Sequence, residues 1–142
     1  MRPVPSSQPH ACIEYERERY CAALPAPDVK WPPDVQVMVD EVHAHLFAPG
    51  ITVEALRQRS GLCNHNITSR FRHFVGRSIK DYIVHHRLEL AKRLLRYDAL
   101  TVAQVAFAVG YESPNGFSMT FKRRESQTPT AFRKKVVKKD GM

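Results

Sequence analysis

Two short sets of polar and cationic side chains, 50 residues apart, are the parts of this sequence best suited to contact a nucleic acid. They comprise His65, Thr68, Ser69 and Arg72 in the first set, and Asn115, Ser118, Met119 and Lys122 in the second. Asn pairs with adenine through two hydrogen bonds, Ser and Thr bond to several bases, and Met contacts only the thymine methyl group. Long cations suit phosphates. We therefore expect Arg72, Lys122 and the following Arg123 to contact phosphates, and the other members to contact base edges. The alternative is that all of them are ordinary exposed side chains.

Both sets belong to a longer pattern that occurs twice. The copies are Thr52, Val53, Leu56, Gly61, Ile67, Phe71, Arg72, Ser78 and Tyr82, and Thr101, Val102, Val105, Gly110, Phe117, Phe121, Lys122, Thr128 and Phe132. The offset is 49 residues up to the glycine and 50 after it. A glycine permits the positive φ of a tight turn between two helices. The pattern predicts two helix-turn-helix units, and a helical wheel with Ile67 and Phe117 turned inward places the two polar sets outward.

The elements around these units are predicted to be helical. Residues 34 onward show helical periodicity and no sustained strand alternation, which predicts an all-α fold of about seven helices. Thr52 and Ser78 are expected N-caps, and Thr101 forms a capping box with Gln104. The expected divisions are a tail or linker with a possible short helix at 1–33, a first unit at 34–77, a linker helix at 78–98, a second unit at 99–135 and a basic tail at 136–142.

Two details of the helices are open to test. The helix of the first polar set is expected to turn Ile67, Phe71 and Phe74 inward. The linker helix has two apolar faces and a narrow polar strip, which predicts a rod covered from two directions. A rod of 21 residues spans roughly 30 Å, close to the 34 Å of one DNA turn. It is therefore expected to present two recognition helices to successive major grooves.

The first third of the chain is predicted to contribute little to the fold. Residues 11–24 form a short helix with Ile13, Tyr20, Cys21 and Leu24 on one side, and the proline-rich segment 25–33 reads as a linker. We interpret the whole segment as a tether; the alternative is a docking or dimerisation segment.

The uneven distribution of charge along the chain favours an anionic partner for residues 51–142. The net charge is +8, but residues 1–50 carry −3 and residues 51–142 carry +11. Such asymmetry favours nucleic acid first and a membrane surface second. The three cysteines form no CxxC, and no signal peptide or membrane-spanning stretch is recognisable, so we expect a reducing compartment, the cytoplasm.

Chemistry other than binding has little support. His43 and His45, Cys63 and His65, and the pair His85-His86 are close in sequence, but no metal-ligand motif such as HExxH is present. We expect no enzyme activity, metal or cofactor.

The segment TVAQVAFAVGYESPNGFSMTFKRRESQTPTAFR, with its A-x-x-x-G, aromatic-Ser, F-K-R-R and T-P motifs, resembles the AraC/XylS family of bacterial transcription regulators. The segment ITVEALRQRSGLCNHNITSRFRHFVGRSIKDYIVHHRLELAKRLL resembles the first unit and linker helix of that family, and the resemblance covers about residues 34–135. It departs from the family at the end of the second recognition helix, where Glu125 and Ser126 replace an aromatic residue and a glycine.

The resemblance implies a double-stranded DNA-binding domain, usually of an activator that contacts RNA polymerase at promoters in the nucleoid. The family's base-contacting positions fall on His65, Thr68 and Ser69 and on Asn115, Ser118 and Met119. Many members also carry a ligand-sensing domain, for which this chain has no room, so a stand-alone regulator or a fragment is expected. A helical protein-interaction module without DNA binding is the alternative function.

Overall fold

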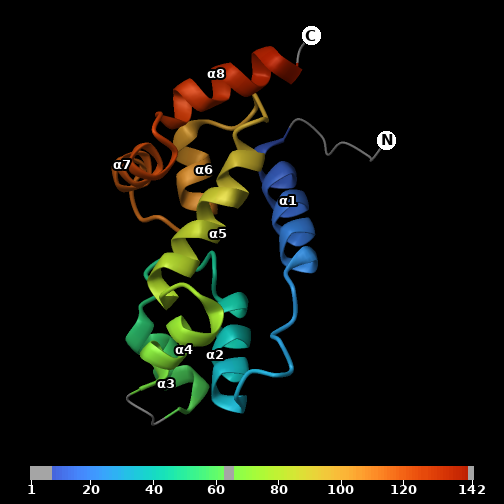
Figure 1. Ribbon diagram of the computed structural model, residues 1–142. Coiled ribbons are helices and arrows are strands. Elements are labelled where there is room, and N and C mark those ends of the chain that lie inside the picture. The colour runs from blue at the N-terminus through green and yellow to red at the C-terminus, as the bar shows by residue number, and fades with distance from the viewer. Residues whose placement is uncertain (1–7, 63–65, 141–142) are drawn as a thin grey trace.

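The computed structural model describes residues 8–62 and 66–140, and this part of the chain forms eight helices and no strand (Figure 1). The helices are α1 Pro9–Ala23, α2 Pro33–Ala44, α3 Val53–Ser60, α4 Ile67–Val75, α5 Ile79–Leu94, α6 Val102–Ala108, α7 Pro114–Glu125 and α8 Pro129–Asp140. The predicted all-α fold is confirmed, with one helix more than expected. Residues 136–140, expected to belong to a basic tail, are part of α8. The start of this helix is fixed by the Thr128 side chain, which accepts a hydrogen bond from the backbone N–H of Ala131, and by Pro129, which suits the first turn.

Two apolar cores lie at the two ends of α5. One joins α2, α3 and α4 to the first turns of α5, around Ile67, Phe71 and Ile79. The other joins α1, α6 and α7 to the later turns of α5, around Leu94 and Phe117. Helix α5 therefore runs from one unit into the other (Figure 1), and its apolar residues divide along its length between the two cores.

The predicted caps are present. The Thr52, Ser78 and Thr101 side chains each accept a hydrogen bond from a backbone N–H three residues later. Gln104 completes the capping box by accepting from the N–H of Thr101. These caps fix where α3, α5 and α6 begin, since each satisfies a backbone donor that the helix itself leaves free. The end of α7 is costlier: Ser126 adopts φ 64°, a conformation that glycine takes without steric penalty.

The linker helix is shorter than predicted. It ends at Leu94 instead of about Asp98, so its 16 residues span about 24 Å. Beyond Leu94 the chain turns back, and both Leu95 and Leu100 are completely buried in the second core. The predicted match between rod length and one DNA turn is thus wrong for the rod alone.

The predicted inner face of α4 is correct for two of its three residues. Ile67 and Phe71 are fully buried, whereas Phe74 is 37% exposed. Phe74 lies in the last turn of α4, which ends at Val75. The helical period places Phe74 on the same face as Ile67 and Phe71, but it does not predict how far along that face the neighbouring helices extend.

Helix α1 is part of the second unit's core, in contrast to the tether we expected over this segment. It packs along α5, and its buried face consists of Cys12, Glu16 and Tyr20, four residues apart, while Cys21 is exposed. The expected face of Ile13, Tyr20, Cys21 and Leu24 is therefore rotated. The periodicity failed here because one of the three buried positions is a carboxylate, whose Oε2 accepts a hydrogen bond from the Tyr97 hydroxyl.

The contact of α1 with α5 includes a chain of tyrosine and histidine side chains. The Tyr20 hydroxyl bonds to His86 Nδ1, and the Tyr82 hydroxyl lies 2.7 Å from His43 Nε2. The rings of Tyr82 and His86 are 4.5 Å apart. Burial, reinforced by the charges of His85 and His43, lowers the pKa of His86 from 6.5 to about 4. Burial also lowers the pKa of His43.

We expect this cluster to make the fold sensitive to acid. Between pH 6.5 and about 4, His86 binds a proton when unfolded but not when folded, so the free energy of unfolding falls as pH falls through this window. Urea unfolding at pH 7.5, 6.0 and 5.0 measures it. The variant His86→Gln keeps a polar group without the titration and should show a shallower fall. The control is His10→Gln, since the His10 side chain is 83% exposed. Equal slopes for wild type and His86→Gln would contradict this assignment.

Two arginines from later helices bind backbone carbonyls just beyond the ends of α2 and α5. Arg87 donates through Nε to the Leu46 carbonyl at 2.7 Å and through Nη2 to the Ala48 carbonyl at 2.8 Å. Arg133 donates to the carbonyls of Leu95 and Tyr97 at 2.8 and 3.2 Å. The two acceptor pairs are 49 residues apart, the same offset as the repeat, although the two arginines are 46 apart.

Candidate nucleic-acid interface

The side chains proposed for the interface lie on the outer faces of α4 and α7. On α4, Thr68, Ser69 and Arg72 are exposed while Ile67 and Phe71 are buried. On α7, the four exposed members are Asn115, Met119, Lys122 and Arg123, while Ser118 is partly buried. His65 lies outside the described residues. Apart from Phe74, the described residues of α4 and α7 thus lie on the sides that the helical wheel predicted, whereas contact of these residues with a nucleic acid stays a prediction.

Two members of the second set touch each other. The Asn115 side-chain amide lies 3.8 Å from the Met119 sulfur, one helical turn away. Just before them, the Ser113 hydroxyl caps α7 by accepting from the N–H of Gly116 at 3.0 Å. A Cβ at Gly116 would come within 3.2 Å of that hydroxyl oxygen, so the glycine gives room to the cap. Asn115 is thus held in a well-defined first turn.

Ion pairs fix α7 across α5. The Asp81 carboxylate lies 2.6 Å from Arg124 and 2.9 Å from Arg77, and the Lys92 ammonium lies 3.4 Å from Glu125. The hydrogen bonds from Arg77 and Arg124 hold the pKa of Asp81 below its ordinary value. Arg124 and Glu125 are consecutive residues at the end of α7, and their partners Asp81 and Lys92 lie 11 residues apart, near the two ends of α5, so these pairs hold the end of α7 against α5.

Helix α4 is held by a different set of contacts. Arg70 donates to both Asp34 carboxylate oxygens, at 2.8 and 3.1 Å, which joins α4 to the start of α2. Phe71 packs edge-on against Tyr82 of α5, with ring centroids 5.6 Å apart. Arg70 is thus paired with Asp34, whereas Arg72, two residues later, is exposed to solvent.

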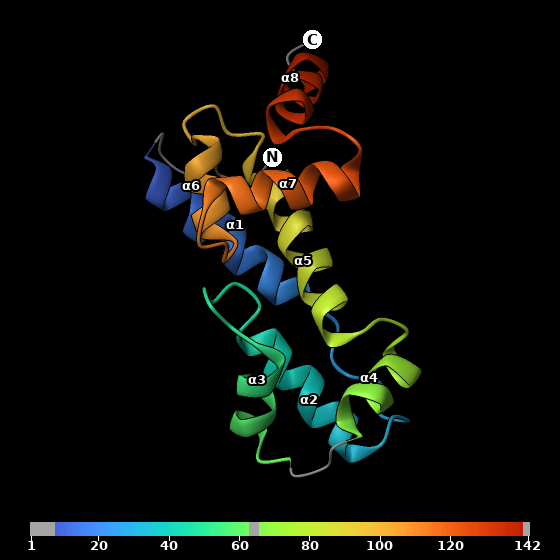
Figure 2. The ribbon, with the colours of Figure 1, turned by 90° about the vertical axis from the view of Figure 1, so that its left-hand side faces the viewer.

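Both recognition helices lie on one side of the molecule. In Figure 2, α7 crosses in front of α5. Helices α3 and α4 lie below α7, and α1 lies behind α5. Figure 1 shows the same division, with α7, α3 and α4 on the left and α1 on the right. A straight partner can therefore meet both units from the side opposite α1.

Arg87 connects the two units, and sequence reasoning missed it. Besides its bonds to the carbonyls of Leu46 and Ala48, its guanidinium lies 5.5 Å from the ring centroid of Tyr111. A Cβ on Gly110 would lie only 2.8 Å from its Cζ. Gly110 is thus required both by its φ of 105° and by the arginine packed against it. Arg87 is almost completely buried, and burial lowers its pKa.

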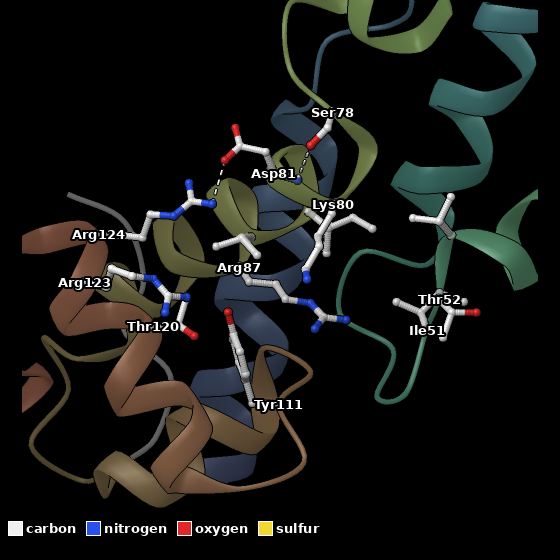
Figure 3. Close-up of a pocket in the computed structure, with 13 residues that line it drawn as sticks. Ile51, Thr52, Ser78, Lys80, Asp81, Arg87, Tyr111, Thr120, Arg123 and Arg124 are labelled. Carbon is white, nitrogen blue, oxygen red and sulfur yellow. Dashed lines mark hydrogen bonds and ion pairs between the residues drawn. The ribbon is translucent and has the colours of Figure 1, made fainter. Parts of the chain in front are cut away.

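A groove of about 720 Å³ opens between the units, on the α7 side (Figure 3). Its walls come from the start of α3, the first half of α5 and the second half of α7. Its charged lining residues are Lys80, Asp81, Arg87, Arg123 and Arg124. The aliphatic hydroxyls of Thr52, Ser78 and Thr120 and the phenolic hydroxyl of Tyr111 also line it. Lys80 and the floor formed by Arg87 and Tyr111 were not identified from the sequence, because residues up to 73 apart in the chain meet here.

Other kinds of site are not seen in the part of the chain that is described. Within 8–62 and 66–140, no three His, Cys, Asp or Glu side chains gather as a metal site. Every helix in the same ranges is too short or too polar to cross a bilayer.

A family model described as a helix-turn-helix domain matches residues 50–135. Among curated relatives, the transcriptional regulator AlkR of Acinetobacter baylyi is 33% identical over 101 residues, covering 71% of this chain and 33% of AlkR. The transcriptional activator RhaR of Pectobacterium atrosepticum is 29% identical over 119 residues, covering 84% and 42%. The chain thus spans between a third and about two fifths of the length of these relatives.

Two solved structures share the fold. One is the DNA-binding domain of AdpA, a global transcriptional factor, in complex with a target DNA. It superposes with a TM-score of 0.61 at 26% identity, covering 68% of this chain and 88% of that one. The other, an AraC-type transcriptional regulator of Chromobacterium violaceum, has a TM-score of 0.59 at 23% identity, covering 71% and 89%, and supports the fold alone.

Proposed function

Since the chain belongs to the AraC-type helix-turn-helix domain family, we propose that it is a sequence-specific, double-stranded DNA-binding transcription regulator. It inserts α4 and α7 into successive major grooves of its operator. The single observation that carries this proposal is the placement of two matched, exposed polar sets on α4 and α7, on the same side of the fold. The AdpA domain, which has this fold, was solved with a target DNA.

The roles of individual residues follow from their chemistry. Arg72, Lys122 and Arg123 pair with phosphates. Base edges are contacted by residues from the early turns of both helices, namely His65, Thr68, Ser69, Asn115, Ser118 and Met119. The net charge of +11 over residues 51–142 supplies the sequence-independent part of the affinity.

The wider biology is proposed on the same basis. The relative RhaR is named as an activator, and we propose that this chain also activates transcription, through contact with RNA polymerase, in the cytoplasm at the nucleoid. We expect it to have no catalytic activity. The curated relatives are about twice as long as this chain, and a ligand-sensing domain is proposed for the case in which this chain is part of a longer regulator.

Selection of binding sites from random duplex, followed by footprinting, tests this function. The expected result is two protected patches about one helical turn apart. Affinity should fall by several orders of magnitude between 50 and 200 mM salt if about six to ten phosphates are contacted. A chain that binds no duplex even at low salt would instead be a helical protein-interaction module.

Asn115 gives a sharper test of base recognition. Asn115→Ala should relax preference at one base pair of the selected site, with about 1–3 kcal/mol of discrimination lost there. Affinity for unrelated duplex should change little, because a neutral side chain contributes nothing to counterion release. Competition with single-position operator variants measures it, and Thr130→Ala, an exposed position on α8, is the control. An equal loss on every duplex would show that Asn115 contacts no base edge.

A further inference from the structure

We propose that the groove between the two units holds the phosphodiester backbone of the duplex, at the point where it passes from one recognised major groove to the next. This inference rests on the proposed function and adds to it a third contact region, which shares Arg123 with the outer face of α7 and otherwise lies between the two recognition helices. Its distinctive member is Lys80, on the first turn of α5.

The position of the groove is the first argument. It lies between α3 and α7, on the side from which both units are open to a partner (Figure 2), and α1 covers the opposite side of α5. Any duplex that meets α4 and α7 together must pass over it. The strand segment between two successive major grooves on one face borders the minor groove, where the protein meets phosphates before it meets bases.

The charge of the groove is the second argument. Four cations, Lys80, Arg87, Arg123 and Arg124, line it together with one carboxylate, that of Asp81. That carboxylate is already paired with Arg77 and Arg124. The net charge of the charged lining residues is therefore +3, which suits an anionic polymer and disfavours an acid-rich or metal-binding role.

Two of the cations that line the groove are available to bind an anion. Two nearby cations, Arg77 just before α5 and Lys92 on α5, are both in ion pairs. Lys80 and Arg123 are exposed and have no ion-pair partner among the described residues. Figure 3 shows the Lys80 side chain on the α5 side and the Arg123 side chain on the α7 side, with Arg87 and Tyr111 close to both. Two free cations on opposite walls can pair with phosphates without breaking an existing contact.

The floor makes the groove rigid. Arg87 is fixed by two carbonyls and by the Tyr111 ring, and Asp81 with Arg124 ties the α7 wall to the α5 wall. Because the walls are fixed before binding, Lys80 and Arg123 are presented at a set separation, and less ordering entropy is lost on association.

The test measures how the affinity of the full chain for its selected duplex depends on salt. Lys80→Gln and Arg123→Gln should each lower the slope of log affinity against log salt by about 0.9, on specific and unrelated duplex alike. The wild-type advantage should therefore shrink about threefold to fourfold between 50 and 200 mM salt. Arg19→Gln changes an exposed residue of α1, the helix on the opposite side of α5, and is the matched control that should leave the slope unchanged.

A modified duplex identifies the contacted phosphates. Neutral methylphosphonates replace the phosphates midway between the two protected patches, and Lys80→Gln should then cost no further affinity. If the unmodified duplex gives two patches but Lys80→Gln leaves the slope unchanged, the groove proposal fails while the proposed function stands. A loss that persists in full on the methylphosphonate duplex also overturns it, since the ammonium then acts elsewhere. Absence of any duplex binding overturns both.

Discussion

Replacing Gly110 by alanine should be among the most destabilising single changes in this chain, with a loss of about 3 kcal/mol or more. Part of the loss comes from the backbone, because φ 105° is a conformation that costs an L-residue about 1–2 kcal/mol. The rest comes from Arg87, whose Cζ would lie 2.8 Å from the new Cβ. Urea unfolding of the variant and the wild type measures the difference.

The expected loss for Gly110→Ala is large because Arg87 cannot move away from the new Cβ without losing its own hydrogen bonds. A surface arginine would swing away at little cost, but this guanidinium is buried and donates to the carbonyls of Leu46 and Ala48. Moving it leaves two carbonyls without their donor, and hydrogen bonds from a charged group contribute about 1.5–3 kcal/mol. The contact of Arg87 with both units therefore determines how far the loss for Gly110→Ala exceeds the backbone cost of the glycine turn.

Gly76 supplies the matched control. Its φ is 94°, close to that of Gly110, but a Cβ there would meet no atom within 4 Å. Gly76→Ala should therefore show only the backbone cost. In an Arg87→Ala background, Gly110→Ala should cost about as much as Gly76→Ala, so that the double-mutant cycle returns a coupling of about 1–3 kcal/mol. Equal losses of stability for Gly110→Ala and Gly76→Ala in the wild-type background would mean that Arg87 moves away from the new Cβ at little energetic cost.

The parts of this fold that repeat were predictable from the sequence. Matched caps at Thr52 and Thr101, matched turn glycines and matched inward aromatic residues gave two units and the direction of their outer faces. Each of these signals is local, since it depends on residues within one or two helical turns. Ile67 and Phe117 could be placed inside because a helix with one apolar stripe has only one way to bury it.

The parts that connect the units were not predictable in the same way. Arg87 reaches acceptors 39 and 41 residues earlier in the chain, and nothing in the local pattern of α5 marks it as buried. The buried face of α1 contains Glu16, which only its distant partner Tyr97 makes tolerable. The end of α5 at Leu94 depends on where Leu95 and Leu100 find a core. Such contacts require the tertiary structure, because each is made by residues far apart in the sequence.

The same distinction explains which parts of the candidate interface could be predicted from the sequence. The helical wheel predicted the exposed faces of α4 and α7, because the exposed face of one helix follows from the period of that helix alone. The groove lined by Lys80, Arg123 and Tyr111 required three separate segments to be placed relative to one another. The contacts that bring them together, Arg87 with Leu46 and Asp81 with Arg124, are also those that hold the two recognition helices in a fixed relation.

Reversing the charge of one recognition helix should disconnect that unit from the duplex and leave the other bound. A glutamate at Arg72 would face phosphates that the wild-type arginine neutralises, so the Arg72→Glu variant should lose the patch protected by α4. The Lys122→Glu variant should lose the patch protected by α7. Because the second contact of a two-unit binder is intramolecular, losing it should cost about 10²–10⁴ in affinity. Footprinting and filter binding on the selected site measure the two effects separately.

The milder variants Arg72→Ala and Lys122→Ala should retain both patches, weaken binding on all sequences, and lower the salt slope by about 1 each. Arg19→Glu on α1 changes the net charge as much as either reversal, yet lies on the side away from α7 and should leave both patches. Complementary footprints from Arg72→Glu and Lys122→Glu can arise only if α4 and α7 occupy different parts of one site. If both reversals instead weaken the same patch, one unit alone contacts DNA, and the fixed relation between the units serves stability instead of recognition.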